Sequence, residues 1–373
     1  MSLLKKKGGK NQSGASKTKT IAGRIFMIIV LVGMTALVAG HFTDFQKLAK
    51  AMSDVNWWWI AAGVLIHIAY FFGYALLYTF GFAVVGVESA ALELLPVVFA
   101  GIFVNAVVPS GAGAAALFID DAIQRGQSGS RTAIGVVLVL IIDLVTLIPF
   151  VFWGVAFLVR HHIFKTYDAI GVGVFVIYTV ILVMLIVFSR WEPQWVKKIL
   201  GWVRKLVSKV GGWFKHPDLL PKEWPEKIAG EFCEASMAIG RHPKMLTISI
   251  LWSILVHGVN AFGLWVLVKA FGESIPAGGL VAAFGLGIVF FVIVAIPQGV
   301  AIVEAIMTLI FTSLGVDQSK AVAATLVFRS VNFWLPLVVG LLFLWKIRRF
   351  GQRSYQGNGR SEEQNDSAAE KSA

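Results

Sequence analysis

Three ionisable side chains, Asp143, Glu304 and Arg329, interrupt long apolar stretches of the sequence. A charge in hydrocarbon is costly and is tolerated mainly where it is paired or faces water, so each of the three is a candidate for function. One cation and two carboxylates do not cancel, so the spare carboxylate must be protonated, face water or meet a cationic substrate. Two interpretations are open: the three residues line a polar cavity, or Arg329 pairs with a carboxylate only to hold helices together.

The apolar stretches around these charges indicate the class of protein. Of the 373 residues, 57% are hydrophobic and 14% are charged, against about 25% charged in soluble domains. Several stretches exceed the roughly 18 residues that indicate a membrane helix. We therefore expect an all-α, polytopic membrane protein, which excludes a soluble enzyme, a disulfide scaffold and an outer-membrane barrel. About six full spans are expected, at 22–40, 57–80, 131–159, 168–189, 245–270 and 321–345.

A further apolar stretch, 92–108, meets a break formed by Pro109, Gly111 and Gly113. Proline removes a backbone donor and glycine loosens a helix, so we expect the helix to break within the membrane. Asn105, one turn before the proline, can satisfy backbone groups that the break frees. The arm after the break has about 12 residues and rises roughly 18 Å, less than the ~30 Å hydrocarbon core. This region is therefore predicted to be a re-entrant hairpin.

A second broken region has the same layout. The stretch 277–296 meets Pro297 and Gly299 and continues as a short arm, 300–314. Each broken region is followed by a full span that contains an internal proline and a mid-membrane charge, so the two form a weak internal repeat. The glycines expose backbone amides, and the second arms point helix N-termini into the protein. Such termini favour anions such as phosphate.

The distribution of basic residues predicts the topology. Net charge is +12, and much of it lies in the tails and in the segment 190–244, which indicates topology and attraction to anionic lipid, not nucleic-acid binding. The 11 basic residues of that segment are Arg190, Lys197, Lys198, Arg204, Lys205, Lys209, Lys215, Lys222, Lys227, Arg241 and Lys244. The positive-inside rule places them in the cytoplasm together with both termini, in the inner membrane of a bacterial or archaeal cell.

This topology requires both broken regions to be hairpins. If the first one crossed the membrane instead, the segment 190–244 would face outside. Two hairpins that enter from opposite sides form an inverted repeat, which many transporters use.

The chain divides into a membrane domain with two tails. Residues 1–20 are expected to be a disordered, basic cytoplasmic tail, 21–350 the transmembrane domain and 351–373 a disordered C-terminal tail. Within the domain, 190–244 is expected to be an interfacial cytoplasmic segment that begins with an amphipathic helix at the headgroups.

Motifs of soluble catalysis were not found. The sequence has no HExxH, Walker A or GxSxG pattern, and its polar segments are too short to hold a catalytic domain. The single cysteine, Cys233, excludes an intramolecular disulfide and a cysteine-based zinc site. We expect no enzymatic activity, no cofactor and no metal.

The two breaks and the last span carry a family resemblance. The run from Asn105 to Gly113, and the run from Pro297 to Glu304 followed by Phe328 to Gly340, resemble the conserved stretches of the lysylphosphatidylglycerol synthase transmembrane (flippase-like) family. The similarity covers most of 21–350. It implies an inner-membrane protein of the kind that forms the flippase part of aminoacyl-phospholipid synthases. The synthase domain is not matched, so we expect no synthesis of aminoacylated lipid.

These observations predict a flippase-like transporter that moves a phospholipid or lipid-linked amphiphile between leaflets through a central charged cavity. The expected partners are membrane lipids with anionic headgroups. The expected substrate-binding residues are Arg329, Glu304, Asp143, Pro109, Gly111, Gly113, Pro297, Gly299 and Asn105. The alternative is a non-transport partner or regulator of an envelope-lipid or glycosyltransferase enzyme, and a membrane-embedded enzyme is a third.

Overall fold

The computed structural model describes Met52 and residues 55–107, 112–213, 223–293 and 299–344. The predicted first span, both predicted tails and the hairpin-tip residues Pro109, Gly111 and Pro297 lie outside the described residues. A compact unit begins at Val55, and the description below concerns this unit. Its described regular structure is helical, which confirms the expected all-α class.

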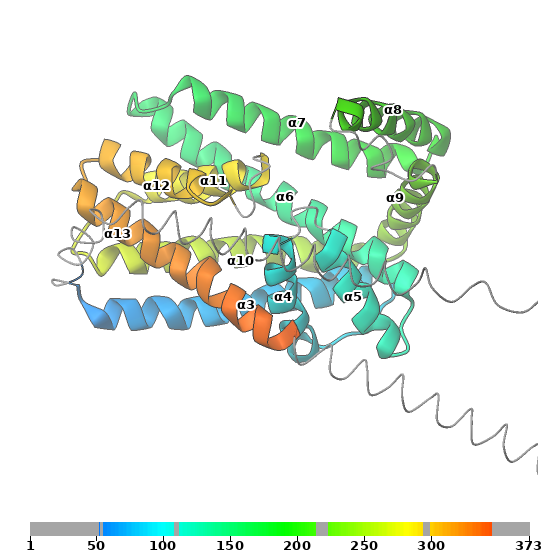
Figure 1. Cartoon of the computed structure of the whole chain (residues 1–373), viewed down its shortest axis with the longest axis horizontal. Helices are drawn as coiled ribbons and strands as arrows, with labels where there is room; N and C mark the ends of the chain where they lie inside the picture. The colour runs from blue at the N-terminus through cyan, green and yellow to red at the C-terminus, as the bar shows by residue number, and fades with distance from the viewer. Residues whose placement is uncertain (1–51, 53–54, 108–111, 214–222, 294–298, 345–373) are drawn as a thin grey trace, which may run out of the picture. The chain divides into compact units, whose positions relative to one another are not determined.

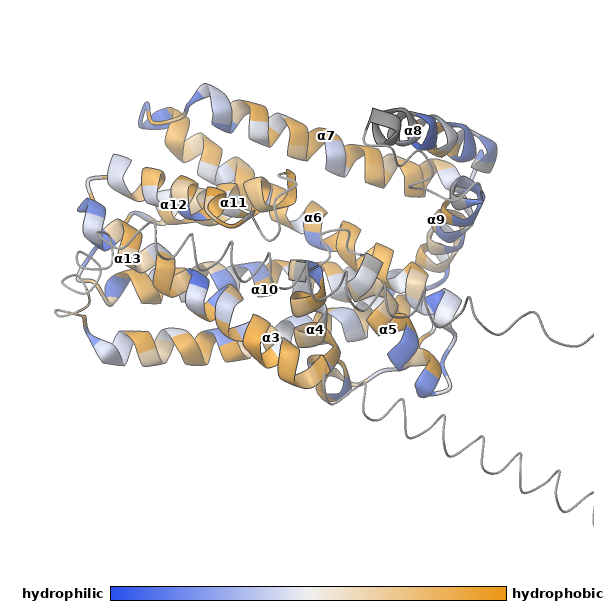
Figure 2. Cartoon of the chain, in the orientation of Figure 1, coloured by the Kyte–Doolittle hydropathy of each residue, from blue (hydrophilic) through white to orange (hydrophobic). Residues whose placement is uncertain are grey.

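Five helical segments in the described ranges are long and apolar enough to cross a membrane. They confirm the expected positions of five full spans, and the expected span at 22–40 is not described. Figure 2 shows the hydrophobic residues that run along these segments. The segments are α3 (Trp57–Val84), α6 (Gly129–Arg160), α7 (Thr166–Ser189), α10 (Pro243–Lys269) and α13 (Gln318–Arg329), which continues as the π-helix η2 (Ser330–Trp334) and then as α-helix to Leu344.

Each broken region forms a pair of shorter helices that pack against each other (Figure 1). The pairs are α4 (Ala91–Val107) with α5 (Ala112–Gln124), and α11 (Ala277–Ile293) with α12 (Ile302–Ser313). In the first pair, Arg125 beyond the end of α5 reaches Glu93 at the start of α4, with 3.1 Å between Nη1 and Oε2. In the second pair, Leu314 beyond the end of α12 lies against Gly279 at the start of α11. Both regions therefore turn back on themselves, as expected.

The two hairpins open at opposite ends of the helical bundle. The backbone N–H of Asn56, just before α3, donates to the backbone oxygen of Ala270, just after α10, over 2.9 Å. Helices α3 and α10 are thus antiparallel neighbours. The hairpin α4–α5 follows the C-terminal end of α3, and the hairpin α11–α12 follows the C-terminal end of α10. Because α3 and α10 are antiparallel, these two ends lie at opposite ends of the bundle, and Figure 1 shows the two hairpins displaced in this way. An inverted repeat requires this arrangement.

Small residues bring the helices into close contact. A Cβ atom at Gly154 of α6 would lie 2.6 Å from the Cα of Ala282 in α11. In membranes, helix association depends on such close approach, because lipid chains are as apolar as leucine and burial alone gives little stabilisation. Helix α11 is buried along most of its length, so it forms the centre of the helical packing.

Two helices follow α7 in the polar segment: α8 (Pro193–Trp213) and α9 (Trp224–Arg241). Val196 and Leu200 of α8 are buried, while Trp195 and Trp202 are 61% and 64% exposed. Lysines share the exposed surface of α8, and a tryptophan stripe beside lysines is typical of a helix that lies at the headgroups. The expected amphipathic helix is therefore present, and its location at the membrane surface remains a prediction.

We predict that the segment containing α8 and α9 faces the cytoplasm. A cysteine placed at exposed Lys227, in a Cys233→Ser background, is expected to react with a membrane-impermeant maleimide only after cells are permeabilised. The matched control is a cysteine at exposed His162, in the α6–α7 loop at the other end of the bundle, which is expected to react in intact cells. Labelling at position 227 in intact cells would invert the topology and both hairpins.

Candidate functional site

The charged pair at the centre of the candidate site is Arg329 with Glu304. Arg329 ends α13, and its Nε donates to Glu304 Oε1 over 2.7 Å. The two side chains are 7% and 17% exposed. A buried guanidinium–carboxylate contact of this length is a strong, charge-assisted hydrogen bond. The prediction that Arg329 lies within reach of one of the two carboxylates is confirmed.

Glu304 is positioned by the first turn of α12. The N-cap residue of this helix is Ala301, whose side chain cannot accept a hydrogen bond from the first-turn amides. A carboxylate in the first turn is favoured by the helix dipole. Glu304 Oε2 is buried and has no hydrogen-bond partner among the described residues. The site thus combines a guanidinium, an uncapped helix N-terminus and a carboxylate oxygen that is not hydrogen-bonded.

Arg329 is positioned by a local widening of the last span. Proline at position 336 has no backbone N–H, so it cannot continue the α-helical ladder. The chain responds with the π-helical turn Ser330–Trp334, in which the N–H of Leu335 donates to the oxygen of Ser330. The guanidinium carbon of Arg329 lies 4.8 Å from the centre of the Phe333 ring, a cation–π distance. Short π-helical segments occur frequently at functional sites.

The second break has a constrained backbone. Gly299 has φ = 59°, and Ala301 has φ = 71°. A Cβ at Gly299 would lie 2.8 Å from Val303 Cγ2 and 3.2 Å from the Cα of Phe291 in α11. Glycine is required here both by conformation and by the approach of α11.

We predict opposite effects for two substitutions at this break. Gly299→Ala is expected to destabilise the protein by about 1–2 kcal/mol, because it adds a side chain at positive φ in a filled space. Ala301→Gly is expected to be neutral or stabilising, because it relieves the same backbone conformation. Thermal unfolding of both variants in one detergent measures this. Equal destabilisation by both changes would contradict the described backbone.

The first break is described only at its edges. A Cβ at Gly113 would lie 2.4 Å from Val104 Cγ1, so the two arms pack closely there. The Oδ1 atom of Asn105 is buried and has no hydrogen-bond partner among the described residues. Its predicted role toward the freed backbone groups concerns residues 108–111, which are outside the described ranges, so that role stays a prediction.

Asp143 takes a different partner from Glu304. His257 Nε2 of α10 lies 3.3 Å from the carboxylate Oδ1 of Asp143 and 3.0 Å from its backbone oxygen. One turn away, the hydroxyl oxygens of Thr146 and Ser253 are 2.7 Å apart and connect the same two helices. The structure therefore places the predicted charges in two pairs, one between α12 and α13 and one between α6 and α10.

Sequence analysis missed a row of tyrosines beside Asp143. Tyr70, Tyr74 and Tyr78 follow one face of α3, with ring centroids 6.0 and 5.6 Å apart along the row. Each is close enough to interact electrostatically with Asp143. Tyr78 stacks on Phe118 of α5 at 4.2 Å. Their four-residue spacing was a visible signal, because residues four apart share a helix face.

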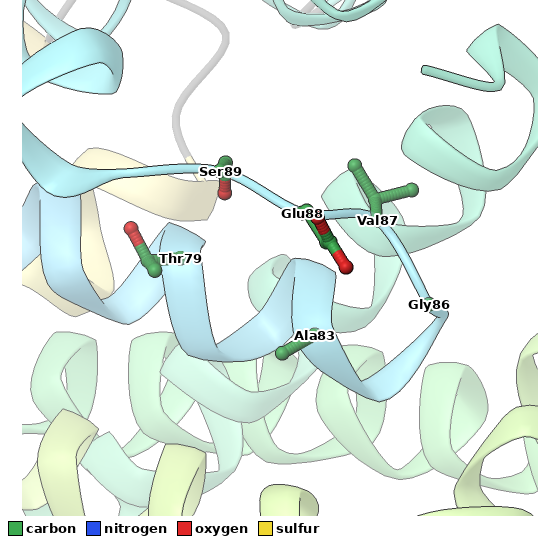
Figure 3. Close-up of a pocket in the computed structure, with 6 residues that line it drawn as sticks. All are labelled: Thr79, Ala83, Gly86, Val87, Glu88 and Ser89. Atoms are coloured by element: carbon green, nitrogen blue, oxygen red, sulfur yellow. The ribbon is translucent and has the colours of Figure 1, made fainter.

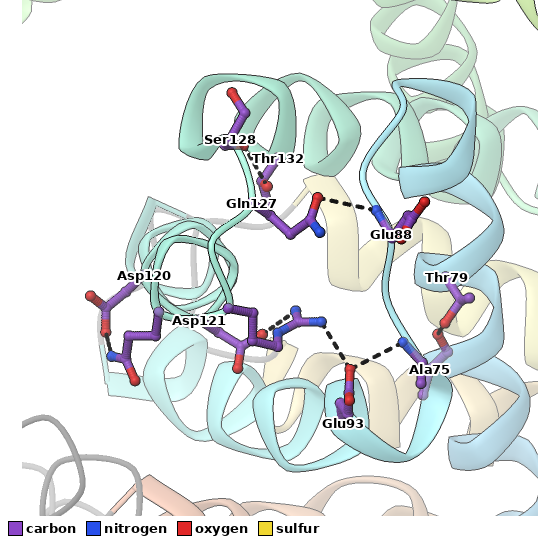
Figure 4. A network of polar contacts seen from close by, with 12 residues as sticks. Ala75, Thr79, Glu88, Glu93, Asp120, Asp121, Gln127, Ser128 and Thr132 are labelled. Atoms are coloured by element: carbon purple, nitrogen blue, oxygen red, sulfur yellow. Dashed lines mark hydrogen bonds and ion pairs between the residues drawn. The ribbon is translucent and has the colours of Figure 1, made fainter. Parts of the chain in front are cut away.

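The mouths of both hairpins are closed by ion pairs. At the first mouth, Arg125 contacts Glu93 and Asp121, and Figure 4 shows the network that joins the start of α4 to the end of α5. At the second mouth, Lys320 Nζ donates to Glu273 Oε1 over 2.8 Å. The first contact joins the ends of α4 and α5. The second joins the loop before α11 to the first turn of α13. Each ion pair thus connects the segments at the base of its hairpin.

A small pocket lies near the first mouth and not at the Arg329–Glu304 pair. Its volume is about 360 Å³. It is formed by the end of α3 and the α3–α4 loop (Figure 3), and its lining residues are Thr79, Ala83, Gly86, Val87, Glu88 and Ser89. The expected central cavity would be bounded by both hairpin tips, 108–111 and 294–298, which the structure does not describe. In the described part of the chain, no group of three or more His, Cys, Asp or Glu side chains is placed to hold a metal ion.

Apolar helices long enough to cross a membrane, two helical hairpins and buried charges define a polytopic helical membrane protein. A family described as the lysylphosphatidylglycerol synthase TM region matches residues 24–340. The match covers most of the chain, and the protein belongs to this family.

Three relatives have similar length and low identity. A UPF0104 membrane protein of Pyrococcus horikoshii is 21% identical over 330 residues, which cover 86% of this chain and 97% of the relative. Two UPF0104 membrane proteins of Methanothermobacter thermautotrophicus are 20% and 22% identical, over 86% and 85% of this chain and 94% and 92% of the relatives. The similarity therefore extends over nearly the whole length of each relative.

Proposed function

We propose that this protein moves a phospholipid or a lipid-linked amphiphile between the leaflets of the membrane. The headgroup engages Arg329 while the acyl chains stay in the bilayer. The observation that carries this proposal is the buried Arg329–Glu304 pair at the uncapped N-terminus of α12. A membrane protein that needed only adhesion between two helices could use small apolar residues, at no cost in buried charge.

The pair can act as an exchangeable anion site. A headgroup phosphate offers the guanidinium the same bidentate geometry that a carboxylate offers. It can also accept hydrogen bonds from the first-turn amides of α12, which the Ala301 side chain leaves uncapped. Glu304 then competes for Arg329 and lowers the affinity for the phosphate, so that the lipid can leave again.

The arrangement of the two hairpins supports movement of a lipid between the leaflets. They open at opposite ends of the bundle, and α11 and α12 follow α10 in the way that α4 and α5 follow α3. Inverted repeats of this kind support alternating access around a central site. The family description also names a lipid, lysylphosphatidylglycerol, which supports a lipid as the substrate class.

The test is lipid movement in proteoliposomes that contain the full-length chain. Fluorescent phospholipids with anionic, zwitterionic and cationic headgroups are compared, and the outer-leaflet label is bleached with dithionite. We expect movement faster than in protein-free vesicles, and fastest for the anionic headgroup. If no headgroup moves while the protein co-purifies with an envelope-lipid or glycosyltransferase enzyme, the partner role replaces the transport role.

A further inference from the structure

The second buried pair, Asp143 with His257, is separate from the headgroup site. It lies between α6 and α10, whereas Arg329 and Glu304 lie on α13 and α12. The two side chains are 24% and 6% exposed, and both residues lie near the middle of apolar helices long enough to cross the membrane. A lipid headgroup site at Arg329 does not require this pair, so it needs its own explanation.

We infer that Asp143 and His257 bind one exchangeable proton, and that this proton couples lipid movement to a proton gradient. The inference that this proton couples lipid movement to a gradient rests on the proposed function. The inference that the pair binds a proton rests on the geometry of the pair alone.

The hydrogen bonding fixes where the proton can go. A backbone carbonyl can only accept, so His257 Nε2, which lies 3.0 Å from the oxygen of Asp143, carries a hydrogen. The ring nitrogen that gains or loses a proton is then Nδ1. Asp143 Oδ1 is 3.3 Å from Nε2 but has no hydrogen bond among the described residues. The carboxylate is thus close enough to be stabilised by an imidazolium, and its other donor is the Ser253 hydroxyl.

One proton decides the charge of the pair. With that proton, the pair is either a neutral carboxyl beside a neutral imidazole or a carboxylate beside an imidazolium, and both forms have zero net charge. Without it, a carboxylate faces a neutral imidazole, and the net charge is −1. A net charge in the membrane core is costly, so the pair keeps its proton until water reaches it from one side.

The groups that face Asp143 leave it without another counter-ion. From α3 the titratable groups are Tyr70, Tyr74 and Tyr78, which are neutral at ordinary pH. From α10 the group is His257. In the described ranges, no charged side chain of α5, α7, α9 or α11 pairs with Asp143, and α11 presents Phe284 to the imidazole at 6.3 Å.

The tyrosine row gives the proton a path. The three tyrosines lie four residues apart along α3, with neighbouring ring centroids 6.0 and 5.6 Å apart, and each interacts electrostatically with Asp143. Hydroxyl groups both donate and accept hydrogen bonds, so together with water they can pass a proton along one helix face.

Carbodiimide labelling tests the site without any transport. Dicyclohexylcarbodiimide modifies protonated carboxyl groups in apolar surroundings, and mass spectrometry of the full-length protein in lipid nanodiscs locates the adduct. We expect labelling of Asp143 to increase as pH falls, while Glu304, paired with Arg329, serves as the internal comparison. His257→Gln is expected to change the pH dependence of this labelling, because the carboxylate loses the imidazole that lies 3.3 Å from it. Labelling of Asp143 that is absent or independent of pH would overturn the site.

A pH gradient across the proteoliposome membrane tests the coupling. Wild-type protein is expected to move lipid several-fold faster when the gradient is imposed, and Asp143→Asn and His257→Gln are expected to lose this response. If labelling depends on pH but wild-type protein moves no lipid, the proton site stands and the transport proposal fails. If lipid moves without response to the gradient, the coupling fails. If lipid moves without response to the gradient and the labelling of Asp143 is also independent of pH, the proton site fails and the proposal of lipid transport stands.

Discussion

Replacing Arg329 by alanine is expected to slow lipid movement in proteoliposomes by about 30-fold or more. Removal of one partner of a buried, hydrogen-bonded charge pair costs at least about 2 kcal/mol, and a factor of ten in rate corresponds to about 1.4 kcal/mol. The matched control is Lys269→Ala. Lys269 lies at the end of α10, where its Nζ donates to Ser274 Oγ over 3.2 Å, so its loss is expected to change the rate by no more than about twofold.

A double variant separates transport from helix packing. Arg329→Ala alone leaves Glu304 buried and unpaired, which is expected to destabilise the protein by about 3–5 kcal/mol. Arg329→Met combined with Glu304→Gln removes both charges and is expected to recover much of that stability without recovering lipid movement. Recovery of both properties would show that the pair serves only to hold α12 and α13 together.

The second large effect is expected from Gly340→Ala. Gly340 lies where the last span crosses α4, and a Cβ there would lie 2.0 Å from the backbone oxygen of Phe99 and 2.7 Å from its carbonyl carbon. Backbone atoms cannot rotate away as a side chain can, so the helices must separate. We expect destabilisation of about 3 kcal/mol, at the upper end of ordinary overpacking, measured as thermal unfolding in detergent.

Gly258→Ala is the matched control for Gly340→Ala. Gly258 is also inside a long helix, α10, but a Cβ there meets no atom within 4 Å. Alanine is expected to be neutral or to stabilise by up to about 1 kcal/mol, because it favours the helix. If the two variants unfold at the same temperature, the close crossing of α4 and the last span is wrong.

The spans and the hairpins could be predicted because they depend on length and composition. The hydropathy of the stretch 131–159 is sufficient to predict a span, and α6 (Gly129–Arg160) contains this stretch. The Arg329–Glu304 contact could be predicted for a related reason, since an arginine in the membrane core needs a partner and few candidates exist.

The partner of Asp143 could not be predicted in the same way. His257 is 114 residues away in the sequence, and a helix that is apolar on all sides has no periodicity to indicate which face meets which neighbour. The π-helical turn after Arg329 was also missed, although Pro336 signals some disturbance of the helix. The spacing of the tyrosines in α3 does not by itself indicate a functional role, because aromatic side chains at helical spacing commonly serve only in packing.

The ion pairs at the two hairpin mouths have a consequence for experiments with sealed vesicles. Arg125–Glu93 and Lys320–Glu273 lie at opposite ends of the bundle, and each pair has at least one well-exposed partner, 55% exposed for Glu93 and 42% for Lys320. The screening length falls from about 10 Å at 0.1 M salt to about 3 Å at 1 M. Salt added to one compartment only would therefore weaken the base of one hairpin and leave the other unchanged. The ionic strength on each side of the membrane thus sets the strength of the ion pair at the base of one hairpin independently of the other.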